Sequence, residues 1–325
     1  MAEKTRISSR LNYIDQLRGI AILLVILGHY LIALTPERFA HPVVQIIYSF
    51  HMPLFFFISG YVTSKFSQNN IQTIPFIKKK ASTLLLPWFF WTIIPPLILN
   101  ERLELGNLSF YPFNGIWFLP ALFCIFIVFV IYNYIQKHLL NSFMSCLLVC
   151  APFAIIGTYI KDFQLFMYII YWITFWFGTM LSNSNCSKYI KRPKVIAVIS
   201  VIFVCTEIFY PLSADGLLIK SMLNLIMFLI TSILGSLIIY FLIRSIELPV
   251  LLEKYLSNMG RYSIVLYLTP IWVLPNAVNC SSKESVAYIC IIGLIATIIH
   301  SLISYGIGCV VYLIPYLKFF LYGKK

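Results

Sequence analysis

The first apolar stretch of the chain carries three ionisable side chains whose spacing could support proton transfer. Asp15 and Arg18 lie near its start, and His29 follows Arg18 by eleven residues. In an α-helix this spacing puts Arg18 and His29 within about 20° of each other on one face, about 16 Å apart along the axis. Asp15, three residues before Arg18, can pair with its guanidinium group. We therefore predict a polar stripe from the membrane surface to its middle, ending in a histidine suited to proton transfer.

A plainer interpretation of the same residues stays open. Arg18 and Asp15 could be anchors at the membrane interface, and His29 a hydrogen-bonded contact between helices. Ionisable groups at bilayer depth are costly and mark functional sites by default. We therefore favour a functional role for His29, whereas the two interpretations of Arg18 are balanced.

The second apolar stretch holds His51 near its middle. A short connection makes the first two stretches antiparallel neighbours, so His51 could approach His29. The alternative is a packing histidine that hydrogen-bonds a backbone carbonyl. The sequence alone leaves both possibilities open.

Two further features are candidates for binding. Lys78, Lys79 and Lys80 lie in the loop expected after the second stretch, where they could bind a phosphorylated cytoplasmic cofactor. Basic inner loops are also common for reasons of topology alone. Trp117 opens the fourth stretch near the expected outer interface, where tryptophan is frequent.

The elements that must position these residues are membrane helices. Hydrophobic residues make up 60% of the 325-residue chain and charged residues only 11%, which is far from the composition of soluble domains. We predict an all-α integral membrane protein with about ten transmembrane helices. They are expected at residues 14–34, 43–62, 84–99, 115–134, 143–160, 165–181, 195–209, 222–242, 263–278 and 286–312.

The distribution of charge predicts the orientation of these helices. With both termini cytoplasmic, 19 of the 24 lysines and arginines fall on the inner side, as the positive-inside rule requires. The remaining five are Arg38, Arg102, Lys161, Lys220 and Lys283. The net charge of +13 is therefore explained by topology, and we expect no nucleic-acid partner.

No part of the chain has the composition of a separate soluble domain, so we expect a single membrane domain over residues 1–325. The eight cysteines are scattered, mostly within apolar stretches, and no pair has metal-ligand spacing. We therefore expect no metal. Phosphate-binding loops, nucleophile elbows and zinc-binding helix motifs are absent from the sequence.

The sequence resembles acyltransferase family 3, bacterial membrane O-acyltransferases that modify surface polysaccharides, over nearly its whole length. The resemblance rests on three segments in order: Asp15-x-x-Arg18-Gly19-Ile20-Ala21 with His29, the block 50–61 from Phe50-His51-Met52-Pro53 to Gly60-Tyr61, and Trp117-Phe118-Leu119-Pro120-Ala121. The spacing from arginine to histidine in the first helix is the family's signature. The chain looks like the stand-alone type, without an added extracytoplasmic domain.

The resemblance implies transfer of an acyl group, most often acetyl, from cytoplasmic acyl-CoA to a sugar hydroxyl of a surface polysaccharide or its lipid-linked precursor. It implies a place in the bacterial plasma membrane. His29 would act as the general base or carry the acyl group itself. Arg18 would bind a phosphate of CoA or polarise the path near the inner face, and Asp15 would orient Arg18.

Further roles follow from the same resemblance. Lys78, Lys79 and Lys80 would hold CoA phosphates, His51 would assist His29 or bind acceptor hydroxyls, and Trp117 would stack on a sugar ring. The lysines stand where members of the family often have arginines, and Pro270 stands where a histidine is common. The rival hypothesis is a non-enzymatic transporter or flippase for lipid-linked sugars, which would also need many spans and buried polar groups.

Overall fold

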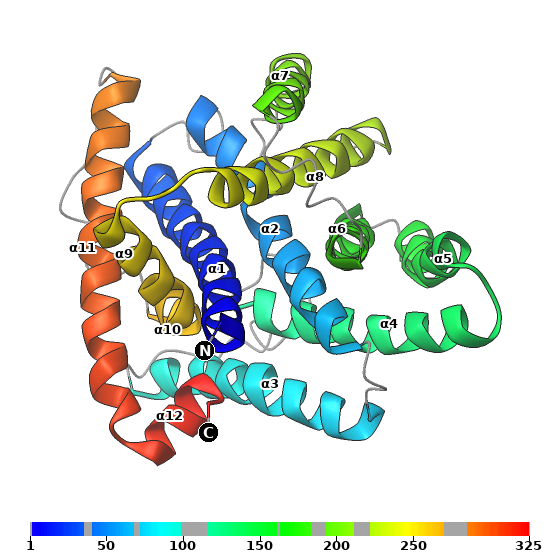
Figure 1. The fold of residues 1–325 in the computed structure, drawn as a ribbon, viewed down its shortest axis with the longest axis horizontal. Coiled ribbons are helices and arrows are strands. Elements are labelled where there is room, and N and C mark those ends of the chain that lie inside the picture. The colour runs from blue at the N-terminus through cyan, green and yellow to red at the C-terminus, as the bar shows by residue number, and fades with distance from the viewer. Residues whose placement is uncertain are drawn as a thin grey trace. The chain divides into compact units, whose positions relative to one another are not determined.

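The computed structural model describes residues 2–35, 41–67, 72–98, 116–160, 163–183, 193–210, 222–269 and 285–324. Within these ranges the chain is helical and forms no strand (Figure 1). Continuous helix satisfies the backbone hydrogen bonds of an apolar chain internally, as a bilayer requires. The predicted all-α class is therefore confirmed for this part of the chain.

The helices in chain order are α1 (Ala2–Leu34), α2 (Pro42–Ser67), α3 (Thr73–Ile98), α4 (Phe118–His138), α5 (Ser142–Ile160), the 3-10 turn η3 (Phe163–Phe166), α6 (Met167–Asn183), α7 (Pro193–Phe209), α8 (Met222–Ser245), α9 (Val250–Arg261), α10 (Ser263–Leu268), α11 (Val286–Tyr312) and α12 (Pro315–Tyr322).

Six helical segments in the described ranges are long and apolar enough to cross a membrane: Asn12–Leu34, Pro42–Ser64, Phe118–His138, Ser142–Tyr159, Met222–Ser245 and Val286–Tyr312. Each coincides with a predicted span. Ten spans and cytoplasmic termini stay predictions.

One expectation is wrong, one is tested only in part, and two helices were not predicted. The predicted loop around Lys78–Lys80 is wrong, because α3 begins at Thr73 and the lysines lie within its first turns. The first residues of the predicted ninth span form α10, which ends at Leu268. The part of this span from residue 270 onward lies outside the described ranges and stays a prediction. Helices α9 and α12 were not predicted, because each is too short to produce a span-length apolar stretch.

The chain forms two compact units. The first comprises Met1–Ser59 and Asn183–Gly308, and the second Gly60–Ser182 and Cys309–Lys325. In the second unit, α3 packs against α4 and α12, and α5 packs against α4. Its core is aromatic, with Trp172 and Phe175 fully buried.

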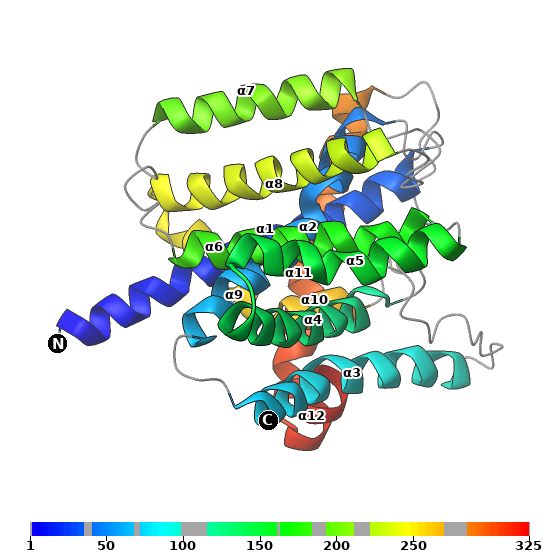
Figure 2. The same cartoon turned by 90° about the vertical axis from the view of Figure 1, so that its right-hand side faces the viewer.

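In the first unit, α1 packs along α9 (Figure 1) and α7 packs along α8 (Figure 2). The contact of α1 with α9 depends on two glycines. A Cβ atom at Gly19 would overlap the backbone carbonyl of Leu256, and one at Gly260 would overlap that of Asp15. The two backbones therefore touch, as small residues permit in membrane proteins. This contact fixes the end of α9 beside the start of the first apolar stretch.

Replacing Gly19 with alanine should destabilise the first unit by about 1–3 kcal/mol, because the methyl group meets backbone rather than a movable side chain. Thermal unfolding of the purified protein in detergent measures the loss. Gly306→Ala in α11 is the control, since its Cβ would meet no atom within 4 Å. Equal melting temperatures for the two variants would contradict the proposed backbone contact.

Candidate active site

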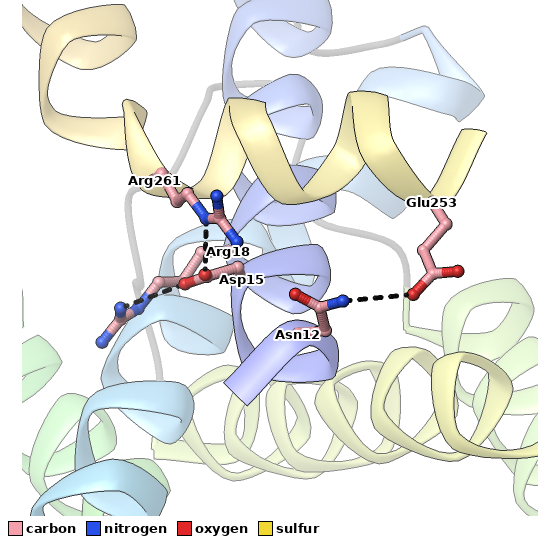
Figure 3. Close-up of polar contacts among 5 residues, drawn as sticks. All are labelled: Asn12, Asp15, Arg18, Glu253 and Arg261. Atoms are coloured by element: carbon pink, nitrogen blue, oxygen red, sulfur yellow. Dashed lines mark hydrogen bonds and ion pairs between the residues drawn. The ribbon is translucent and has the colours of Figure 1, made fainter. Parts of the chain in front are cut away.

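Asp15, Arg18 and Arg261 form a charge cluster at the start of the first apolar stretch (Figure 3). Arg261 Nε donates a hydrogen bond to Asp15 Oδ2 over 3.2 Å. Arg18 Nη1 lies 3.8 Å from Asp15 Oδ1, as the three-residue spacing predicts. One carboxylate is thus shared by two guanidinium groups, which gives the cluster a net charge of +1.

The cluster exists because α9 lies against α1. Gly260 allows the close approach, and Arg261 follows it directly at the last turn of α9. A second interhelical contact supports the same register, in which Asn12 Nδ2 donates to Glu253 Oε1 over 3.4 Å. The side chains of Arg18 and Arg261 are 37% and 57% exposed, whereas that of Asp15 is 20% exposed. The positive charges therefore face the exterior of this unit, and the carboxylate lies beneath them. Arginine pairs of this kind suit a phosphate.

His29 lies on α1 near its far end. Its side chain is exposed, although Gly28 and Tyr30 on either side are buried. The ring meets Tyr48 of α2 edge-on, with 6.4 Å between centroids. Gly28 makes this possible, because a Cβ there would stand 2.9 Å from Tyr48 Cε2. Tyr48 belongs to a buried cluster with Leu31 and Ile289, so the wall beside His29 is well packed.

His51 lies on the other side of this tyrosine contact. Its ring meets Tyr48 with centroids 4.6 Å apart, so Tyr48 touches both histidines. The His51 side chain is buried, and Nδ1 lies 2.8 Å from the carbonyl oxygen of Ile47. Because a carbonyl only accepts hydrogen bonds, Nδ1 carries the hydrogen, and Nε2 of the neutral ring keeps its lone pair. The expected approach of the second histidine to the first is thus mediated by Tyr48.

The predicted polar stripe from Arg18 to His29 is interrupted. Helix α1 is continuous, so the two residues share a face about 16 Å apart. Ile22 and Val25 lie on that face between them and are 1% and 4% exposed. The face therefore has two accessible polar ends and a closed apolar middle, because the intervening side chains are packed inside the unit.

The remaining predicted residues belong to the second unit. Lys78 and Lys79 are exposed on α3, whereas Lys80 places Nζ 3.8 Å from the ring centroid of Phe126. That cation–π contact gives Lys80 a structural partner. Trp117 is buried and stacks on Tyr171 with centroids 5.6 Å apart. The Tyr171 ring therefore already covers one face of the tryptophan to which a sugar-stacking role was assigned.

The sequence analysis missed three residues of the first unit. Arg261 reaches Asp15 from 246 positions away, and the only sequence signal was its place after Gly260. Tyr48 precedes His51 by three residues and so shares its face, which periodicity could have indicated. Glu207 is an acidic residue inside a predicted span, a strong signal that the apolar average of that stretch concealed.

Among the residues that the structure describes, no three histidine, cysteine, aspartate or glutamate side chains cluster as metal ligands would.

Comparison with known proteins identifies a matching family and two similar proteins. Residues 11–306 match a family whose description is an acyltransferase domain. Two curated relatives are both described as nodulation protein NolL. The protein from Mesorhizobium japonicum is 31% identical over 191 residues, which cover 53% of this chain and 48% of the relative. The protein from Sinorhizobium fredii is 32% identical over 151 residues, covering 39% of this chain and 38% of the relative.

The chain therefore aligns with about half of the length of the first relative and less of the second. No solved structure matches it.

A double-mutant cycle should detect the shared carboxylate. Asp15→Asn and Arg261→Gln are expected to be coupled by up to about 1 kcal/mol in the free energy of unfolding, the range of partly exposed ion pairs. The coupling should shrink as salt concentration rises. The control cycle pairs Asp15→Asn with Lys254→Gln, an exposed residue on the same helix as Arg261. Equal coupling in both cycles would contradict the Asp15–Arg261 pair.

Proposed function

The chain belongs to acyltransferase family 3, and from this premise we propose that it transfers an acyl group, in the simplest case acetyl, from acyl-CoA to a hydroxyl group of a cell-surface carbohydrate. The observation that carries the proposal is on α1. An accessible histidine lies about 16 Å from an arginine pair suited to phosphate, on one face of one helix. A donor that bears phosphates at one end and a thioester at the other matches this spacing.

The arginine pair is the proposed binding site for the phosphates of CoA. Arg18 and Arg261 together offer fixed, planar donors, which bind phosphate with more defined geometry than lysines do. The Asp15 carboxylate contacts each guanidinium group, and its negative charge offsets part of the repulsion between the two arginines. Lys78 and Lys79, exposed on α3, would add positive charge on the cytoplasmic side.

His29 is the proposed general base. One of its ring nitrogens removes the proton of the sugar hydroxyl while the oxygen attacks the thioester carbonyl carbon. The carbon–sulfur bond then breaks, and the imidazolium returns the proton to the departing CoA thiolate. The products are the sugar ester and free CoA, with no net gain or loss of protons.

A second route uses the same histidine as an acyl carrier. Its lone-pair nitrogen attacks the thioester carbon, the carbon–sulfur bond breaks, and the thiolate takes the proton of the other ring nitrogen, so that CoA leaves as the thiol. The sugar oxygen then attacks the acyl-imidazole, the carbon–nitrogen bond breaks, and the hydroxyl proton passes to the free ring nitrogen. Rapid mixing with labelled acetyl-CoA in the absence of acceptor distinguishes the routes. Label retained on wild-type protein, and absent from His29→Gln, would favour the carrier; the direct route leaves the protein unlabelled.

His51 and Tyr48 would position His29 rather than react. Tyr48 contacts both rings, and the hydrogen bond from His51 to Ile47 fixes the orientation of the second ring. Trp117 stays a proposed contact for the acceptor sugar. The proposed location is the bacterial inner membrane, with Arg18 toward the cytoplasm and acyl-CoA, as the positive-inside rule indicates.

Replacing His29 with alanine should lower acyl transfer about 10²–10⁴-fold, the usual contribution of a general base. Transfer is measured in membranes with labelled acetyl-CoA and the producing cell's own surface glycans, at matched protein level. His138→Ala is the matched control, since His138 is an exposed histidine at the end of α4. Full activity of His29→Ala would remove this residue from the chemistry.

Replacing Arg261 with glutamine should raise KM for acetyl-CoA about tenfold, the loss expected for a hydrogen bond to a charged group. The turnover number should change little, because the thioester end of the donor is untouched. Dephospho-CoA thioester serves as a second donor; a smaller effect with it would assign the 3′-phosphate to this residue. Lys254→Gln should leave both constants unchanged, and an equal rise in that variant would refute a specific role for Arg261.

A further inference from the structure

Glu207 is a carboxylic acid in α7 that the proposed chemistry does not use. Its Oε1 atom is buried and has no hydrogen-bond partner among the described residues. The carboxyl group forms a side-chain hydrogen bond with Ser49 of α2. A buried carboxyl oxygen without a donor is unfavourable by several kcal/mol in an apolar environment, so such groups mark functional sites by default.

Ser49 cannot satisfy this carboxyl group alone. Its hydroxyl carries one hydrogen, and Ser49 Oγ also donates toward the carbonyl oxygen of Ile46 over 2.9 Å. The backbone carbonyl of Ser49 accepts a hydrogen bond from Ser232 of α8 over 2.9 Å. The site therefore has more acceptors than donors, and an occupant that supplies hydroxyl hydrogens would complete it.

Two buried aromatic rings lie close to the pair in the sequence. Phe50, the residue after Ser49, meets Phe203 of α7 edge-on with centroids 5.8 Å apart, and both rings are buried. In the described ranges, Glu207 belongs to no group of three or more histidine, cysteine, aspartate or glutamate side chains that could hold a metal ion. A neutral molecule with several hydroxyl groups, such as a sugar, fits the acceptor-rich chemistry of the pair.

The Glu207–Ser49 pair is also associated with the end of α1 that carries His29. Ser49 follows Tyr48, which contacts His29, whereas Arg18 lies about 16 Å away along α1. The Glu207–Ser49 pair is thus associated with the histidine end of the helix and not with the arginine end. A donor held at the arginine end leaves this end for the second substrate.

We infer that Glu207 and Ser49 form part of the acceptor subsite, in which the Glu207 carboxyl accepts a hydrogen bond from a sugar hydroxyl next to the one that is acylated. The inference rests on the proposed function and extends it from donor to acceptor. Glu207 binds and orients the sugar; the proton transfer stays with His29.

The test compares the two substrates separately. Acyl transfer is measured in membranes with acetyl-CoA and the producing cell's surface polysaccharide after chemical removal of its O-acetyl groups. Glu207→Ala should raise KM for the polysaccharide about tenfold, as expected for loss of a hydrogen bond to a carboxyl group, and should leave KM for acetyl-CoA unchanged. Glu207→Gln, which keeps one acceptor oxygen, should lie between wild type and Glu207→Ala. Thr206→Val is the matched control on the same helix, since the Thr206 hydroxyl bonds only its own helix backbone at Ile202.

A merely structural role makes different predictions. If Glu207 and Ser49 only join α7 to α2, then Glu207→Ala lowers the melting temperature and weakens both substrates equally, and the inference is wrong. The inference is also wrong if KM for the polysaccharide is unchanged. Ser49→Ala combined with Glu207→Ala should cost less than the sum of the single changes, because both act on one ligand. Wild-type protein that transfers no acyl group would instead overturn the proposed function itself.

Discussion

The backbone contact between α1 and α9 is the constraint on which the charged end of the site depends. Gly19 and Gly260 each lack the Cβ that would keep the two helices apart. Without that contact Arg261 could not reach Asp15, and Arg18 would face the carboxylate alone. In a membrane, where lipid is as apolar as leucine, close packing of small residues is one of the few forces that fix helices together. The position of Arg261 beside Asp15 thus follows from the absence of a side chain at two glycines.

The shared carboxylate also explains why two arginines can lie together. Like charges repel, and a carboxylate between them reduces that repulsion while leaving a net positive charge for a ligand. The arrangement is partly exposed, so its contribution to stability is small and its value lies in orientation. Asp15 is therefore better understood as a residue that positions the guanidinium groups than as one that stabilises the fold.

Features that depend only on residue spacing within one helix could be predicted from the sequence. The apolar stretches predicted the long helices, and the three-residue spacing predicted the contact of Asp15 with Arg18. The sequence could not predict Arg261, because that contact joins residues 246 positions apart through helix packing. The loop expected at Lys78–Lys80 was wrong because polarity marks the edge of a membrane, whereas a helix such as α3 continues beyond it. Glu207 was visible as a single acid in an apolar stretch, but its partner Ser49 became apparent only when α7 and α2 were placed together.

The closed middle of the α1 face bears on the competition between a sugar and water. A thioester is also a substrate for hydrolysis, so an enzyme of the proposed kind must keep water from the reacting carbon until the acceptor has bound. Ile22 and Val25 are packed between Arg18 and His29, so no continuous polar surface leads along α1 from the arginine end to the histidine. In the proposed reaction the pantetheine arm would have to displace or pass these side chains to bring the thioester to His29. Access to His29 would then depend on binding of the donor. In the proposed reaction, an interrupted polar stripe would therefore serve acyl transfer better than a continuous one.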